Sequence, residues 1–440
     1  MSNTNLILDA DSYKFSHFNL YPSNTNAMYS YIEARLKGSV IVPFGIQMWI
    51  KKNLINPITI DNINEAEDIA YKHGVPFNRG GWEYILNECN GYLPIKISGV
   101  PEGTLVNGSV PFLSVYCDDP EVWWLSSYIE TSLQRGIWYP TTIASNDLDS
   151  YKQLKWFYDH GSDNANMINF SLHSFASRGV SSRETAEIGG VSHLVYFKGT
   201  DDAVALKAAR DYYGCDMAGY SVVATEHSVQ CSYGKNNQKE YLNAVIDTYG
   251  KPGYIVSVVM DGYDIYREVD LLCSEYFVNK IKNNGCKFVV RPDSGDMFEV
   301  VPTILSKLEK AFGFTINSKG KKVLNNVAII QGDGITHLTM PMLAQRVFDL
   351  GFAPENVIYG SGGGLLQHVN RDTFKFAQKT SAIRIGDIWI DTVKDPITDP
   401  GKKSKGGLLD SNDFVTYYNG NGILLYEETL DMISSRAKSF

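Results

Sequence analysis

One pattern recurs from residue 165 onward and constrains the fold of this chain more than any other feature. A short apolar, β-branched run ends in Gly, Asp or His, and a segment with helical periodicity follows it. Strands that alternate with helices build an α/β domain around a parallel sheet. We therefore predict an irregular (β/α) barrel-like domain. The seven runs are residues 167–175, 193–201, 220–227, 254–264, 287–296, 326–334 and 356–364.

The intervening segments have the composition of helices, and several finish on Gly, a frequent helix stop. They are "DDAVALKAARDYYG", "NQKEYLNAVIDTYG", "YREVDLLCSEYFVNKIKNNG" and "MFEVVPTILSKLEKAFG". We assign residues 151–380 to this barrel-like α/β domain, which we expect to be the catalytic one.

Residues 1–150 differ in character, since they are rich in aromatic residues and turns. Residues 97–115 alternate as antiparallel strands do. We predict a second, mixed α+β domain over 1–150, joined by 381–440, so that both ends of the chain build it. The run "KDPITDPGKKSKGGL" (394–408) is rich in Gly, Pro and Lys and indicates a mobile basic loop.

Charge and cysteine usage exclude several classes of protein. The net charge of −9 disfavours a general binder of nucleic acid or anionic membrane, whose field would repel this chain. The start of the sequence is polar, and no apolar run approaches the ~18 residues of a membrane span. The six cysteines have no CxxC or metal-ligand spacing, which favours reduced thiols in a cytoplasmic protein.

The polar motifs of the second half stand where the predicted strands end. In a (β/α) barrel the loops after the carboxyl ends of the strands share one face, and the active site lies there. We therefore expect these motifs to converge. They are "HSF", "GTD", "EH", "MD", "RPDSGD", "QGDG" and "GSGGG".

Two of these motifs suit a phosphorylated sugar. In "RPDSGD", Arg291 offers a bidentate donor to an oxyanion beside a carboxylate acceptor, Asp293. An internal Arg–Asp ion pair explains the same residues equally well. "QGDG" repeats the combination of Gly and Asp. The glycines of "GSGGG" indicate either a tight turn or a close approach to a phosphate.

His227 is the histidine whose neighbours most suggest chemistry. Glu226 precedes it, and Asp261 ends the next strand run. A carboxylate partner fixes the imidazole tautomer and raises its basicity, as a phosphate-accepting or acid/base histidine requires. A purely structural histidine is the alternative. The chain contains no nucleophile elbow and no HExxH, so protease, lipase and zinc-hydrolase activities are disfavoured.

Eleven short motifs occur in one order at compatible spacing between about residue 6 and residue 408. Together they closely resemble the nicotinamide phosphoribosyltransferase family. Each motif is weak alone, but eleven in register are specific. They are "LDADSYKFSHFNLYP", "SYIEAR", "LPIKISGVPEG", "RGVSSRETAEIGG", "HLVYFKGTD", "EHS", "DGYDIY", "RPDSG", "QGDG", "GSGGGLLQ" and "KDPITDPGKKSKG".

The resemblance implies a reaction, a fold and an assembly. The reaction condenses nicotinamide with 5-phosphoribosyl-1-pyrophosphate to nicotinamide mononucleotide and pyrophosphate. The fold is the type II phosphoribosyltransferase fold. The assembly is a homodimer in which each active site is completed by the partner. Mg²⁺, held mainly through pyrophosphate and water, and ATP, which phosphorylates the histidine matched by His227 without being required for turnover, are the implied cofactors.

The resemblance also assigns roles to residues of the barrel-like domain. Phe175 stacks on the nicotinamide ring, and Asp201 accepts from the carboxamide N–H₂. Asp261 orients His227. Three basic residues contact pyrophosphate or bound phosphates: Arg178, His227 and Arg291. Five residues hold the ribose and its phosphate or offer backbone N–H groups: Asp293, Gly332, Asp333, Gly362 and Gly363.

Further roles are implied across the dimer interface. Tyr13 of the partner subunit covers the face of nicotinamide opposite Phe175. The resemblance matches four basic residues to cations that the family contributes at this interface: Arg35, Arg371, Lys379 and Lys402.

Asp201 bears on the choice of substrate. A fixed carboxylate accepts from an amide but repels the carboxylate of nicotinate, by roughly 4 kcal/mol at contact for an effective dielectric near 20. We therefore favour the amide over the acid. The alternatives are a nicotinate phosphoribosyltransferase and a non-catalytic binding protein on the same scaffold.

The sequence departs from the family pattern at four positions. Ser174, Ala176 and Ser177 replace a trio that includes a tyrosine in relatives, and Ala377 stands where a phosphate-binding serine is expected. These positions bear on pocket width and phosphate affinity, whereas the reaction class does not depend on them.

Overall fold

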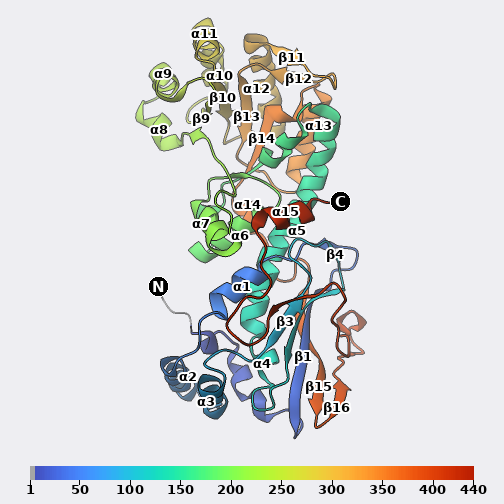
Figure 1. The fold of residues 1–440 in the computed structure, drawn as a ribbon. Helices are drawn as coiled ribbons and strands as arrows, with labels where there is room; N and C mark the ends of the chain where they lie inside the picture. The colour runs from blue at the N-terminus through green and yellow to red at the C-terminus, as the bar shows by residue number, and fades with distance from the viewer. Residues whose placement is uncertain (1–4) are drawn as a thin grey trace. The chain divides into compact units, whose positions relative to one another are not determined.

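The computed structural model describes residues 5–440, which pack into two compact units (Figure 1). Of the described residues, the first unit comprises 5–145, 209–216 and 369–440, and the second comprises 146–208 and 217–368. The domain limits expected at 150 and 380 differ from these bounds. Residue 150 lies inside the long helix α5 (Glu130–Gly161), and residue 380 lies inside strand β15 (Phe376–Ile385).

The second unit is built on a seven-stranded sheet in which every strand pair is parallel. Each strand falls within one of the seven predicted runs. A parallel bridge between Gly199 and Tyr220 links the two edges of the sheet, which confirms the irregular barrel. In sheet order the strands are β7 (Gly199–Thr200), β6 (Leu172–Ser174), β14 (Val357–Ser361), β13 (Val327–Gln331), β10 (Lys287–Arg291), β9 (Ile255–Val259) and β8 (Val223–Ala224).

Helices follow the strands as predicted, and α12 and α13 lie alongside β13 and β14 (Figure 1). The predicted helical stretch over 266–285 forms two helices, because Ser274 is extended and begins a new helix. A small antiparallel hairpin, β11 (Phe314–Ile316) and β12 (Lys322–Leu324), precedes β13. The helices are α6 (Arg183–His193), α7 (Ala203–Tyr213), α8 (His227–Ser232), α9 (Gln238–Tyr249), α10 (Ile265–Leu272), α11 (Glu275–Asn284), α12 (Met297–Phe312), α13 (Thr339–Asp349) and α14 (Gly363–Leu366).

Side chains that alternate along the central strands form a compact apolar cluster. Val289 of β10 is opposite Ala328 of β13, and both pack with Ile330. Phe175, one residue beyond β6, packs against the same cluster. Because Phe175 directly follows the last residue of β6, its ring lies at the carboxyl ends of the strands.

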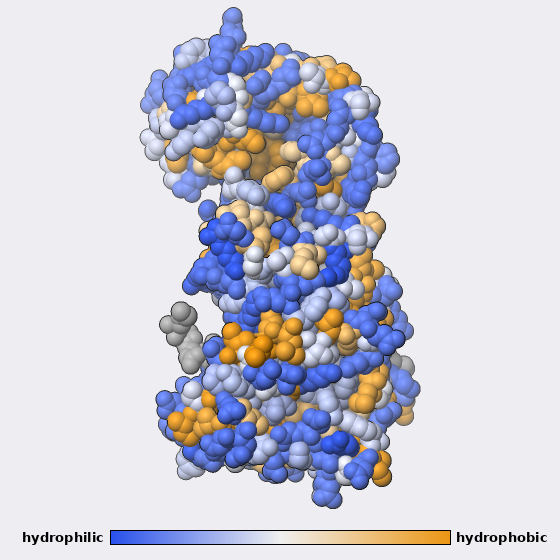
Figure 2. Space-filling model, in the orientation of Figure 1, coloured by the Kyte–Doolittle hydropathy of each residue, from blue (hydrophilic) through white to orange (hydrophobic). Residues whose placement is uncertain are grey.

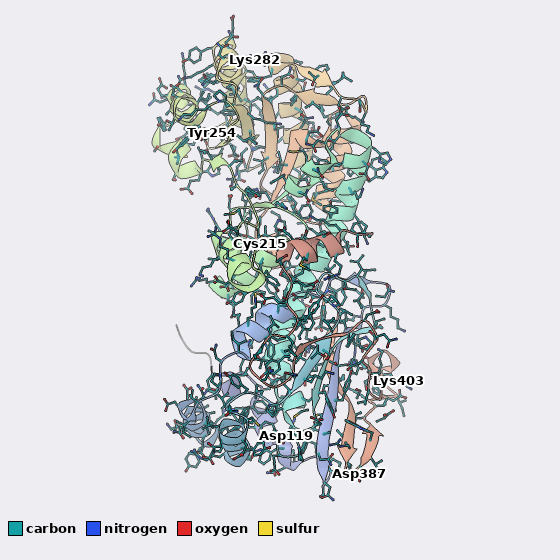
Figure 3. The ribbon with its side chains drawn as sticks, viewed as in Figure 1. Asp119, Cys215, Tyr254, Lys282, Asp387 and Lys403 are labelled. Atoms are coloured by element: carbon teal, nitrogen blue, oxygen red, sulfur yellow. The ribbon has the colours of Figure 1, made fainter. Side chains whose placement is uncertain are left out.

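The first unit contains a six-stranded antiparallel sheet whose strands come from both ends of the chain. This confirms the predicted mixed domain, including the strands expected within 97–115. Asp387 lies in the turn between β15 and β16, the two strands at one edge of this sheet (Figure 3). In sheet order the strands are β16 (Ile388–Asp391), β15, β1 (Thr25–Ala34), β5 (Pro111–Cys117), β3 (Lys96–Gly99) and β17 (Val415–Tyr418).

Helices and a large aromatic-rich core complete this unit. Trp82, Trp124 and Tyr128 pack edge to face, with ring centroids 5.1 to 5.3 Å apart. Strands β2 (Val40–Ile41) and β4 (Val106–Asn107) pair separately. The remaining helices are α1 (Ile46–Asn53), α2 (Ile60–His73), α3 (Arg79–Glu88), α4 (Leu125–Tyr128) and α15 (Leu430–Ala437).

The basic segment 394–408 is anchored to the sheet of the first unit. Lys394 N–H donates to Ser404 Oγ and Ser404 N–H donates to the Lys394 carbonyl, both at 2.8 Å. Lys405 donates its N–H to Tyr31 Oη (2.9 Å) and pairs with Glu33. These bonds anchor the two ends of the segment.

Residues 209–216 belong to the first unit although the sequence around them is part of the barrel-like pattern. The Tyr213 ring stacks on Phe44 at 4.8 Å, and its hydroxyl lies 3.4 Å from Glu102. Cys215 lies in the same short segment (Figure 3). The end of α7 is therefore part of the first unit, although the sequence pattern around it is that of the barrel-like domain.

Across residues 5–440, no helix is both long and apolar enough to cross a membrane. The visible surface is mainly hydrophilic, with apolar patches interspersed (Figure 2).

Glu102 is a buried acid of the first unit and makes its stability dependent on pH. Its carboxylate accepts from Ile46 N–H (2.5 Å) and Gln47 Nε2 (2.6 Å). Burial raises the pKa of Glu102 to about 7, against the opposing effect of these hydrogen bonds. Since the folded pKa lies above the ordinary 4.5, the stabilisation is complete below pH 4.5 and is lost as the pH rises through about 7.

We expect the free energy of unfolding to fall by about 2–4 kcal/mol between pH 4.5 and pH 8, because this stabilisation is lost. The Glu102→Gln variant has no titrating group here, so its urea midpoint, followed by tryptophan fluorescence, should fall less over that range. The exposed Glu121→Gln variant is the matched control and should follow the wild type. Parallel pH profiles for Glu102→Gln and wild type would contradict the role of Glu102.

Candidate active site

The strand ends of the second unit bring most of the predicted site residues to one edge of the sheet. Because the strands are parallel, their carboxyl ends lie on the same side. Each of these residues is the last of its strand or follows it within a few positions. They are Phe175 and Arg178 after β6, Asp201 after β7, His227 after β8, Asp261 after β9, Arg291 and Asp293 at β10, Gly332 and Asp333 after β13, and Gly362 and Gly363 after β14.

Asp261 connects three of these loops. Its side chain is only 4% exposed, and Oδ1 lies 2.9 Å from His227 Nε2 at the start of α8. Oδ2 accepts from Asp293 N–H (3.1 Å) and Ser294 Oγ (2.5 Å) in the loop after β10. A carboxylate can only accept, so Nε2 of His227 is the donor and Nδ1 is the nitrogen left to act as an acceptor. His227 is 46% exposed and reachable from solvent.

Arg291 lies between an aromatic ring and a carboxylate. Its Nη2 donates to Asp293 Oδ2 at 2.9 Å, which confirms the internal ion pair considered from the sequence. Its guanidinium carbon lies 5.1 Å from the centroid of the Phe175 ring, a cation–π distance. Within residues 5–440, no group accepts from its buried Nε. A buried donor without a partner is costly, so Nε suits an incoming acceptor.

Two glycines leave room for this cluster. A Cβ on Gly360 of β14 would lie 2.0 Å from Phe175 Cε2, so the ring occupies the space above this glycine. A Cβ on Gly332 would lie 2.7 Å from Asp293 Oδ1 and 3.4 Å from Arg291 Nε. Phe175, Arg291, Asp293 and Gly332 therefore form one contiguous group at the strand ends.

Asp201 is held by His173 of the "HSF" motif and by Ser221, neither of which had a predicted role. His173 Nε2 lies 2.9 Å from Asp201 Oδ1, and Ser221 Oγ donates to the same oxygen. Burial raises the pKa of the Asp201 carboxyl, but the bonds from His173 and Ser221 and the charge of Arg291 lower it overall. The spacing in the sequence could have indicated that His173 belongs to the site. It lies two residues before Phe175, on the same face of one strand.

The loops after β6 and β14 approach each other closely. A Cβ on Gly179 would lie 3.0 Å from Gly363 N, which explains the small residues in both loops. Gly363 begins α14, where the first N–H groups lack partners inside the helix. Arg178, in the 3-10 helix Ser177–Gly179, is exposed beside this contact.

The atypical serines of the β6 loop have a structural role. Ser174 Oγ (2.5 Å) and Ser177 N–H (3.0 Å) donate to the two carboxylate oxygens of Asp202, which is 1% exposed. Ala176 is fully buried. Ser174 and Ser177 therefore fix the loop after β6, which contains Arg178, against the loop after β7, which contains Asp201.

The first unit contains the other predicted residues, and two of them lie close together. Arg35 follows β1, and Lys379 lies on the paired strand β15. Burial is the largest cause that lowers the pKa of Lys379, and the charge of Arg35 adds to it. Arg35 Nε donates to Glu33 (3.0 Å), but its buried Nη2 has no acceptor among residues 5–440. Ala377, opposite Glu33, brings no hydroxyl to this cluster.

The remaining three residues have local partners. Lys402 pairs with Asp399 at 3.1 Å, and Arg371 with Asp372 at 3.3 Å. Tyr13 is 57% exposed, with its hydroxyl 3.4 Å from Asp11. All three side chains are exposed.

Solved structures share the fold of the whole chain. A human nicotinic acid phosphoribosyltransferase matches with a TM-score of 0.59 at 13% identity, covering 97% of this chain and 92% of its own. A nicotinate-nucleotide pyrophosphorylase from Pyrococcus furiosus matches with a TM-score of 0.58 at 13% identity, covering 98% and 95%. Identities this low show the fold alone.

Comparisons of the sequence identify the family as well as the fold. Residues 170–420 match the nicotinate phosphoribosyltransferase (NAPRTase) family, and residues 5–97 match the N-terminal domain of nicotinamide phosphoribosyltransferase. Two relatives named nicotinamide phosphoribosyltransferase come from Xanthomonas campestris, with 40% identity over 98% of both chains, and Acinetobacter baylyi, with 32% identity over 97% of this chain and 95% of its own. The class is therefore that of the pentosyltransferases with the type II phosphoribosyltransferase fold. Within this class, the chain belongs to the nicotinamide phosphoribosyltransferase family.

The Gly360→Ala variant tests the packing of Phe175. Its Cβ overlaps the ring, so Phe175 must move away from the strand ends. We expect about 1–3 kcal/mol of destabilisation and a 10- to 100-fold loss of transferase activity, because misplacing a site group by about 1 Å costs this much. Urea unfolding and steady-state kinetics measure the two effects.

The matched control is Gly80→Ala on the exposed side of α3, where an added Cβ meets nothing within 4 Å. This variant should retain wild-type stability and activity. Wild-type activity in Gly360→Ala would show that the position of Phe175 is unimportant.

Proposed function

We propose that this chain transfers the phosphoribosyl group of 5-phosphoribosyl-1-pyrophosphate to nicotinamide, releasing nicotinamide mononucleotide and pyrophosphate. The observation that carries the proposal is the group formed by Phe175, Arg291, Asp293 and Asp201 at one edge of the barrel sheet. A flat apolar ring, a cation with a free buried donor, and two carboxylates suit a pyridine carboxamide beside a ribose phosphate. The 40% identity to the Xanthomonas relative supports the same reaction.

The residues act by position and charge. Phe175 stacks on the pyridine ring, and Asp201 accepts from the carboxamide N–H₂. Asp293 and Asp333 accept from ribose hydroxyls, and Arg178 and Arg291 stabilise the negative charge that develops on the departing pyrophosphate. Backbone N–H groups at Gly332, Gly362 and Gly363 face the phosphate.

Mg²⁺ fits this site as a companion of the substrate. Within residues 5–440, no group of three or more His, Cys, Asp or Glu side chains could hold a metal ion. Mg²⁺ is commonly bound through one or two carboxylates, water and substrate phosphates. We propose that Asp293 and Asp333 are the nearest such carboxylates and that the ion neutralises pyrophosphate charge.

We propose a homodimer in which the cations of the first unit serve the partner's site. The buried Nη2 of Arg35 lacks an acceptor among the described residues, and the pKa of Lys379 is lowered by burial and further by the charge of Arg35. An anion would relieve both conditions. Tyr13, Arg371 and Lys402 are accessible for the same purpose, and Tyr13 would cover the nicotinamide face opposite Phe175. Within residues 5–440 the six cysteines form no disulfide, which supports a reducing, cytoplasmic setting.

The two-substrate assay tests the reaction. With 5-phosphoribosyl-1-pyrophosphate and Mg²⁺, kcat/KM should be at least about 100-fold higher for nicotinamide than for nicotinic acid, because Asp201 repels the carboxylate of the acid. The match to the nicotinate phosphoribosyltransferase family makes the acid the second candidate. Higher efficiency with the acid would favour that candidate, and no turnover of either would favour a binding protein.

We further propose that ATP phosphorylates His227 and drives the reaction forward. The ring of His227 is exposed and oriented by Asp261, with Nδ1 free to accept the phosphoryl group. The His227→Ala variant should lose ATP stimulation, measured as the ratio of turnover with and without ATP, and should lose acid-labile labelling from γ-labelled ATP. His160→Ala, an exposed histidine of α5, is the control and should keep both. ATP stimulation that survives in His227→Ala would exclude the phosphohistidine.

A further inference from the structure

The two oxygens of the Asp201 carboxylate have different surroundings. Oδ1 receives both local donors, His173 Nε2 at 2.9 Å and Ser221 Oγ. No hydrogen bond from the described part of the chain reaches Oδ2. The side chain is 41% exposed although Oδ1 is occupied, so Oδ2 is the oxygen open to a ligand.

His173 is itself rigidly held. It is the middle residue of β6, between Gly360 of β14 and Gly199 of β7 in the parallel register. Its ring is largely buried and lies 4.9 Å from the Phe175 ring. A Cβ on Gly199 would lie 2.8 Å from His173 Nδ1, so the backbone of β7 closes off the other side of the ring.

The contacts of His173 reach both groups that would hold the substrate. One side of the imidazole contacts the ring proposed to stack on nicotinamide, and Nε2 bonds the carboxylate proposed to accept from its amide. Movement of His173 would therefore change the angle between the stacking plane and the acceptor Oδ2. Ser221, which follows the bridge residue Tyr220, donates from the opposite edge of the sheet.

We infer that His173, assisted by Ser221, is a positioning residue that sets the preference for a carboxamide over a carboxylate by presenting Oδ2 of Asp201 as a fixed acceptor. This inference rests on the proposed nicotinamide phosphoribosyl transfer. Two donors on Oδ1 hold the carboxylate plane and favour its ionised form, in accordance with the lowered pKa of Asp201. An unsupported carboxyl rotates and protonates more readily. In its protonated form it donates a hydrogen bond and thus accommodates the carboxylate of an acid substrate.

The experiment compares His173→Ala, His173→Gln and Ser221→Ala with the wild type, using kcat and KM for nicotinamide and for nicotinic acid from pH 5 to pH 8. In His173→Ala we expect KM for nicotinamide to rise about 10- to 30-fold, the effect of losing a charge-assisted hydrogen bond. The selectivity for amide over acid should fall by about tenfold or more, most strongly at low pH, with kcat changed less than KM. Ser221→Ala should show a smaller change in the same direction.

His173→Gln keeps an N–H donor at the end of a side chain of similar reach, so it should restore most of the selectivity. Ser232→Ala is the matched control for Ser221→Ala, because its hydroxyl donates only to Val229 of its own helix. This control should leave selectivity unchanged. If His173→Ala does not fold, the Ser221→Ala and His173→Gln variants carry the test.

The outcomes separate this inference from the proposed function. A wild type that prefers nicotinic acid would overturn the proposed function itself. A wild type that prefers nicotinamide, with unchanged selectivity in His173→Ala and Ser221→Ala, would overturn the positioning role alone. An equal loss of activity on both substrates at all pH values would mean that His173 is merely structural, and would also overturn it.

Discussion

The buried carboxylate of Asp261 is the interaction on which the arrangement of the site depends. A buried carboxylate is stable only if donors compensate for its lost hydration. Asp261 draws these donors from the start of α8 and from the loop after β10. The positions of His227, Asp293 and Ser294 are therefore linked through one group. The loops after β8, β9 and β10 are fixed by this side chain as much as by the strands that carry them.

A continuous set of contacts extends from Asp261 across the sheet edge. Asp293 pairs with Arg291, Arg291 lies over Phe175, and Phe175 packs on His173, which holds Asp201. Glycines at 332 and 360 are needed because the side chains of this group fill the space that a Cβ would take. Phosphate chemistry and ring recognition thus share one rigid framework, which helps to align the two substrates before they react.

An acidic chain that handles anionic substrates must concentrate its positive charge locally. The net charge is −9, yet among residues 5–440 a buried donor of Arg291 has no acceptor, and the same holds for Arg35 in the other unit. Each of these arginines also pairs with one carboxylate, Asp293 or Glu33. Such pairing keeps the guanidinium in place and leaves part of its hydrogen-bonding capacity for a ligand.

Much of the fold could be predicted because local patterns and strand topology agree. All seven predicted strand runs contain a strand of the barrel sheet, since β-branched runs bounded by Gly and Asp have few other stable conformations. The motifs at their ends converge because parallel strands place their carboxyl ends together. The break at Ser274 and the transfer of residues 209–216 to the first unit were not predicted. The second depends on packing against residues distant in the chain, since Tyr213 stacks on Phe44.

The sequence by itself determined the fold class, the family resemblance and the chemical type of residue at each strand end, because these depend on periodicity and ordered motifs. Only the tertiary structure decided which of these residues are partners. Ser221 lies in no motif, and His173 lies in "HSF" without a predicted role. They matter because strand register and a bridge at the sheet edge bring both to Oδ1 of Asp201. Hydrogen bonding depends on distances of a few ångströms between atoms, and those distances exist only after the strands have paired.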